Sequence, residues 1–153
     1  MNLADEVAYR LVLASGFMSE AELDYGSNRW LNCVRNAQLA VENAGKSVLA
    51  MFEIPHRTHD PAKSIAAVLR NQDLPDSIEQ KIQALLPVLL TLGSTEHFMT
   101  DYGDESSRTP PWDLFDKDSA TEALEAARAS VEGAKEVIAA VEAWRNERNP
   151  NQP

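Results

Sequence analysis

The side chains that could carry chemistry in this 153-residue chain are few, and the histidines come first. His56 and His59 stand three residues apart and Asp60 follows directly, so two imidazoles and a carboxylate could face one metal ion. No third ligand follows at a suitable spacing, and Asp60 precedes Pro61, which is the pattern of a capped helix start. We therefore expect His59 and Asp60 to open a helix, and we expect neither a metal site nor a cofactor.

A second group of candidates is acidic and surrounds a Tyr-Gly pair. Asp101, Asp104 and Glu105 flank Tyr102 and Gly103. Such carboxylates could hold a hard cation or act as a paired acid and base. A solvated acidic turn ahead of a helix is the simpler interpretation, and it is the one that we expect.

Lys46 is the basic residue with the clearest partner. Glu42 precedes it by four residues, and a Glu–Lys pair at this spacing supports an exposed helix. The functional alternative is that Lys46, together with Arg35 or Arg108, lines a groove that receives a phosphate or an acidic partner.

The single cysteine and one tryptophan complete the candidates. Cys33 excludes an intramolecular disulfide and a cysteine-built zinc site, and we expect it to be a buried small apolar residue. Trp112, between Pro111 and Asp113, is expected to anchor its loop in the core, with an exposed contact as the alternative. The chain has no Gly-x-Ser-x-Gly turn and no glycine-rich phosphate loop.

Composition limits the partners of the chain. The formal net charge of -10 and the scattered basic residues argue against tight, sequence-independent binding to nucleic acid. No apolar run reaches the roughly 20 residues that span a bilayer, and the first ten residues do not resemble a signal peptide. We expect a soluble protein in the cytoplasm.

Helical periodicity indicates the elements that must position these residues. Apolar residues recur at spacings of three and four in four segments, and no segment alternates with period two. We expect an all-α, up-and-down bundle of about five helices, at 2–24, 27–53, 61–71, 77–92 and 119–147. Ser27 and Ser119 are the expected N-caps of the second and last helices.

The remaining segments are assigned as follows. A short helical turn is expected within 94–100, and 101–117 is expected to be a long ordered loop. Residues 1–147 are expected to form one domain, followed by a frayed polar tail at 148–153.

Several short strings, in this order, resemble the HEPN family (higher eukaryotes and prokaryotes nucleotide-binding). The first is the Gln-x-Ala-x-Glu-x-Ala-x-Lys-x-x-Leu string of 38–49, and the second is the Pro-x-x-Thr-His-Asp string of 55–60. The third is Asp-Tyr-Gly-Asp-Glu at 101–105, which precedes a proline-containing loop and an alanine-rich helix. The resemblance implies a dimeric helical bundle that often works beside a minimal nucleotidyltransferase, and some relatives are metal-independent ribonucleases.

The chain departs from the family where catalysis would be expected. HEPN ribonucleases have an Arg, then four to six other residues, then a His, but the matching positions ahead of His56, His59 and His97 (49–51, 52–54 and 90–92) carry no Arg. Many relatives also have Arg before the Tyr, and Asp101 stands there instead. The catalytic assignment is therefore not carried over.

The sequence thus predicts a non-catalytic HEPN binding module that engages a nucleotidyltransferase-type partner or a nucleotide. A ribonuclease toxin with an atypical site and a structural helical adaptor are the alternatives. A homodimer is expected because the long helices carry apolar residues beyond one stripe. These are Leu31, Leu39, Leu49, Ala123, Ala126, Val137 and Ala140. The candidate binding residues are Lys46, His59, Asp60, Tyr102, Asp104, Glu105 and Arg108.

Overall fold

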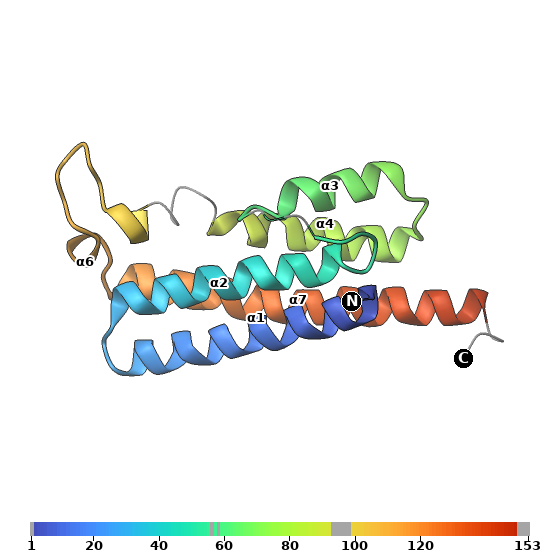
Figure 1. The fold of residues 1–153 in the computed structure, drawn as a ribbon, viewed down its shortest axis with the longest axis horizontal. Coiled ribbons are helices and arrows are strands. Elements are labelled where there is room, and N and C mark those ends of the chain that lie inside the picture. The colour runs from blue at the N-terminus through green and yellow to red at the C-terminus, as the bar shows by residue number, and fades with distance from the viewer. Residues whose placement is uncertain (1, 56, 58, 93–98, 150–153) are drawn as a thin grey trace.

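The computed structural model of the chain is an all-α bundle, as the periodicity predicts (Figure 1). It describes residues 2–55, 57, 59–92 and 99–149, and within these ranges the only β pairing is an isolated bridge between Asp104 and Thr109. The helices are α1 (Leu3–Gly26), α2 (Trp30–Leu49), α3 (Ala62–Asn71), α4 (Asp76–Thr91), α6 (Pro111–Leu114) and α7 (Lys117–Arg148).

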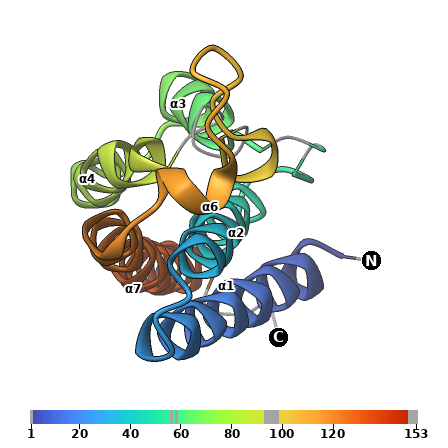
Figure 2. The same cartoon turned by 90° about the vertical axis from the view of Figure 1, so that its left-hand side faces the viewer.

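Helix α2 is the centre of the bundle. It packs against α1 and α7 over most of its length and also contacts α3, α4 and α6 (Figure 2). Thirteen of its 20 residues are buried, and these include the polar residues Gln38, Asn43, Lys46 and Ser47. Because a buried polar group without a partner is destabilising, the hydrogen bonds of α2 largely determine which segments can lie beside it.

Two helix starts differ from the expected caps. Ser27 is the C-cap of α1 rather than the N-cap of α2, because Asn28, with φ of 57°, turns the chain between the two helices. Helix α7 begins two residues before Ser119, at Lys117, where Asp116 and Ser119 form a reciprocal capping box. Helix α2 ends at Leu49, four residues earlier than expected.

The loop regions are shorter than expected. Residues 99–102 form a helical turn, and α6 occupies 111–114, so the expected 101–117 loop is reduced mainly to 103–110. Part of the helical turn expected at 94–100 lies outside the described residues. Among the described helices, none is sufficiently long and apolar to cross a membrane.

The core accounts for much of the apolar surplus from which a homodimer was expected. Leu49, Ala123, Ala126 and Val137 are all buried within the single chain. They fill the space between helices and do not provide a surface for a partner, so this part of the reasoning is wrong.

Candidate functional site

A glycine allows the chain to cross α2 closely at the place where the candidate residues meet. A Cβ atom added to Gly45 would lie 2.5 Å from Cγ of Pro61. The absence of a side chain therefore lets the segment before α3 lie directly on α2. This close approach places His59 above the middle of α2.

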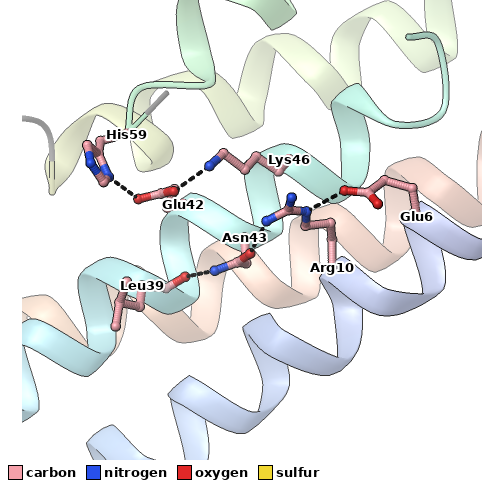
Figure 3. Close-up of polar contacts among 7 residues, drawn as sticks. All are labelled: Glu6, Arg10, Leu39, Glu42, Asn43, Lys46 and His59. Carbon is pink, nitrogen blue, oxygen red and sulfur yellow. Dashed lines mark hydrogen bonds and ion pairs between the residues drawn. The ribbon is translucent and has the colours of Figure 1, made fainter. Parts of the chain in front are cut away.

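Glu42 joins two of the candidate residues in one cluster. Its Oε1 accepts a hydrogen bond from Nζ of Lys46 at 2.5 Å, and its Oε2 lies 2.9 Å from Nδ1 of His59 (Figure 3). The side chains of Glu42 and Lys46 are only 13% and 8% exposed, whereas that of His59 is 62% exposed. The cluster thus consists of a buried ion pair with an imidazole above it at the surface.

This geometry corrects one expectation from the sequence. The Glu42–Lys46 ion pair is present, but it does not mark an exposed helix face. The segment leading into α3 covers it, because Gly45 and Pro61 bring the backbones together. Glu42 was not among the candidate residues, although its spacing from Lys46 was noted.

A separate polar group lies on the α1 side of α2 (Figure 3). Arg10 forms an ion pair with Glu6 at 2.7 Å and donates to Oδ1 of Asn43 at 3.1 Å. Asn43 in turn donates to the carbonyl oxygen of Leu39 at 2.8 Å. These bonds satisfy a buried amide and fasten α1 to α2, so we regard this group as structural.

Residues 99–102 are fastened to α2 through Thr100, which is fully buried. Arg35 donates to its carbonyl oxygen from Nη2 at 2.6 Å and from Nε at 3.2 Å, and Nη2 lies 3.8 Å from the carboxylate of Asp101. The hydroxyl of Thr100 donates to Oε1 of Gln38 at 3.2 Å. Tyr102 lies at the end of this turn with its side chain exposed.

The acidic turn at 104–107 is held together by its own side chains. The carboxylate of Asp104 accepts hydrogen bonds from the hydroxyl of Ser106 at 2.6 Å and that of Ser107 at 2.8 Å. These bonds lower the pKa of Asp104 to about 2. Glu105 and Arg108 are exposed in the same loop, and Arg108 has a φ of 56°. The geometry supports the interpretation of a solvated turn.

The candidate residues therefore do not form one site. Lys46 and His59 meet at Glu42, and Asp60 lies beside them, where its Oδ1 accepts from the backbone N–H of Ala62 at the start of α3. The loop containing Tyr102, Asp104, Glu105 and Arg108 projects from the opposite end of the bundle to the turn that follows α2 (Figure 1). The groove in which Lys46 and Arg108 were to act together is not formed.

The burial of two other side chains, Cys33 and Trp112, can be compared with the expectation from the sequence. Cys33 is buried as expected, and burial raises the pKa of its thiol to about 11. Trp112 is 69% exposed, so the expectation that it anchors the core is wrong. Its four-residue helix turns the indole outward, beside a surface pocket of about 270 Å³ that Trp30 and Phe115 also line.

In the part of the chain that the structure describes, no three His, Cys, Asp or Glu side chains gather so that they could hold a metal ion. The site instead consists of charged side chains on a central helix that are covered by a crossing segment. Together with the antiparallel long helices, this defines a small all-α domain with a surface histidine over a buried Glu–Lys pair.

The HEPN domain profile matches residues 8–144, so the chain belongs to the HEPN family. The fold is similar to that of the crystal structure of TT1696 from Thermus thermophilus. The two share 18% identity at a TM-score of 0.62, over 90% of this chain and 99% of that one. No curated protein matches the chain.

Proposed function

We propose that the protein is a non-catalytic binding module that acts as a homodimer and engages a nucleotidyltransferase-type partner or a nucleotide. The observation that carries this proposal is the sharing of one carboxylate, Glu42, by Lys46 and His59. The charge of the lysine is compensated within the protein, while the exposed imidazole above it can contact a ligand.

The same sharing argues against phosphodiester cleavage. Metal-free cleavage needs a proton acceptor and a cation that stabilises the charge developing in the transition state. Lys46 is buried and paired with Glu42, so it does not present its charge to a substrate. The Arg that HEPN ribonucleases place ahead of their His is missing from the sequence.

Calorimetric titration with ATP tests the nucleotide part of the proposal. We expect saturable binding by the wild-type protein, a loss of at least about tenfold in affinity in His59→Ala, which is about 1.4 kcal/mol, and no change in Lys81→Ala on α4.

Light scattering should give a mass near twice the 16.9 kDa of one chain. A small nucleotidyltransferase gene beside this one would favour a protein partner. If ATP does not bind and no such gene product associates, the structural adaptor is the better interpretation.

One observation favours a second candidate function, a ribonuclease with an atypical site. A carboxylate bound to Nδ1 of a histidine is a common way to orient a general base, and Glu42 holds His59 in this manner. We expect the purified protein to leave single-stranded RNA intact at the rate of buffer alone. Cleavage that His59→Ala or Arg108→Ala abolishes would establish the enzyme and refute our proposal.

A further inference from the structure

Two arginines near the end of α7 share a surface pocket at one end of the bundle. The pocket has a volume of about 370 Å³ and lies where the turn after α2, the connection between α3 and α4, and the last turn of α7 come together (Figure 1). Arg145 and Arg148 line it, and because they are three residues apart on one helix their Cβ atoms are about 5–6 Å apart. None of the described residues that line the pocket belongs to the cluster of Glu42, Lys46 and His59.

Both guanidinium groups are held in place by aromatic rings. Cζ of Arg145 lies 5.7 Å from the ring centre of Phe52, and Cζ of Arg148 lies 5.1 Å from that of Trp144. Arg145 also donates from Nη2 to the carbonyl oxygen of Met51 at 2.5 Å. Because these contacts already restrict the two side chains, less conformational entropy is lost when an anion binds between them.

Neither guanidinium is neutralised by a carboxylate. In the described part of the chain, no Asp or Glu oxygen lies within 4.0 Å of Arg145 or Arg148, whereas Arg10, Arg29 and Arg128 each form an ion pair. The chain has 24 acidic residues, so a shortage of acids does not explain the difference. Like charges this close on a helix are slightly destabilising, and an anion bound between them would remove that repulsion.

The charge of the pocket limits the charge of its ligand. The two guanidinium groups supply two positive charges. Helices α2 and α7 both end beside the pocket, and each helix C-terminus carries about half a negative charge. The balance is about one positive charge, which matches a single carboxylate better than a doubly charged phosphate. Guanidinium groups also bind carboxylates through two parallel hydrogen bonds.

The rest of the lining fits an apolar body attached to that carboxylate. Leu74 is buried, and Phe52 and Trp144 are partly buried against the core. The side-chain amides of Gln72 and Asn149 complete the lining. The net charge of -10 would repel an extended acidic segment of another protein, whereas a small anion brings a single charge to a locally positive place.

From this lining we infer that the pocket binds a small organic acid, with its carboxylate between Arg145 and Arg148 and its apolar body against Leu74. The volume lies within the range of about 300–1,000 Å³ that is usual for small-molecule sites. The inference goes beyond the proposed function and does not rest on it, because the pocket and the His59 cluster are built from different residues.

An NMR titration with hexanoate, against sodium chloride of equal ionic strength, measures this binding directly. At the efficiency usual for small ligands, the eight non-hydrogen atoms of hexanoate give a Kd of about 1–20 mM. We expect the indole N–H signal of Trp144 to shift and to saturate. The indoles of Trp30, at the start of α2, and Trp112, on α6, lie towards the other end of the bundle and should not shift (Figure 1).

Three further probes define the class of ligand. Acetate lacks four methylene groups of hexanoate, and since each buried methylene contributes up to about fourfold, it should bind at least about tenfold more weakly. 1-Hexanol keeps the apolar body but has no charge, and its affinity should also be at least about tenfold lower. Inorganic phosphate, which has charge but no apolar body, should bind more weakly than hexanoate.

Two variants test the role of the guanidinium groups. Arg148→Gln removes one of them and should weaken hexanoate binding by at least about tenfold. Gln72→Glu keeps both arginines but adds a carboxylate of the protein itself to the pocket, so it should weaken binding similarly. Arg128→Gln is the matched control, because Arg128 is an exposed arginine on the same helix outside the pocket, and it should bind hexanoate as the wild type does.

The possible outcomes are distinct. A Trp144 signal that does not shift up to about 50 mM hexanoate, well above the expected Kd, would overturn the inference, and so would an equal affinity in Arg148→Gln. Phosphate that binds more tightly than hexanoate would refute the assignment to a carboxylate. 1-Hexanol that binds as tightly as hexanoate would show an apolar pocket without a role for charge. None of these variants alters Glu42 or His59, so the ATP titration of the proposed function stands or fails separately.

Discussion

Replacing Glu42 by leucine tests the central claim about the site, that Lys46 is a buried cation held by one carboxylate. Removing one partner of a buried ion pair costs about 3–5 kcal/mol, because the other charge is left without compensation. The side chains of Glu42 and Lys46 keep slight contact with water. We therefore expect Glu42→Leu to lower the free energy of unfolding by about 2–3 kcal/mol, below that range.

The double variant E42L/K46M makes the test specific. Replacing both charges by apolar side chains of similar volume is often neutral, so we expect its stability to return to within about 1 kcal/mol of the wild type. The exposed pair of Lys81 and Glu136, 3.8 Å apart, is the control, and its removal should cost about 0–1 kcal/mol.

Urea denaturation followed by circular dichroism measures these differences, and thermal unfolding checks them. At about 2–4 °C per kcal/mol for a chain of this size, Glu42→Leu should melt about 4–12 °C below the wild type. A loss under about 1 kcal/mol, as for an exposed pair, or a double variant whose loss is the sum of the two single losses, would mean that Lys46 is solvated.

Three further predictions concern other parts of the molecule. Gly45→Ala should cost about 1–3 kcal/mol through its collision with Pro61, and an unchanged urea midpoint would contradict that contact. Hydrogen bonds led by the Ser106 hydroxyl lower the pKa of Asp104 to about 2, so their contribution is present above the unfolded pKa of about 3.9 and is lost as pH falls through about 2. In an NMR titration, Ser106→Ala should move this pKa upward, and an unmoved pKa would exclude the bond. Because burial raises the pKa of Cys33 to about 11, its thiol should react with a disulfide reagent only on unfolding, and rapid labelling of the native protein would argue against burial.

The helices could largely be predicted from the sequence because their signal is local. Apolar stripes at spacings of three and four indicated the long helices, and Asp60 at the start of the third helix accepts the backbone bond expected of it. The exact ends were less predictable. Ser27 is equally suited to a turn, and only the left-handed backbone of Asn28 places it after α1.

The environment of the site depended on contacts that no single helix reveals. Lys46 was expected to be exposed because Glu42 lies four residues before it. The same spacing occurs in a helix that other segments cover, so it does not distinguish an exposed pair from a buried one. Lys46 is buried on a helix that contacts five other helices, and the segment before α3 can lie against that helix only because Gly45 leaves room for Pro61. The small residues around Lys46 were the available signal, since a helix covered on all sides has little room for large ones.

Trp112 shows the opposite error. Tryptophan between a proline and an acidic residue was expected to be buried because large aromatic side chains usually are. Its orientation is set instead by a four-residue helix, too short to carry a periodic pattern.

The central position of α2 has a consequence for the synthesis of the protein. One of its long neighbours, α7, leaves the ribosome after all the other described helices, and the end of α7 at Arg148 lies 99 residues beyond the end of α2 at Leu49. At about 5–20 residues per second, the synthesis of α7 is complete roughly 5–20 s after that of α2. During this interval α2 can pack against α1 and against α3 and α4, but the apolar side of α2 that α7 later covers remains open to chaperones and to other nascent chains.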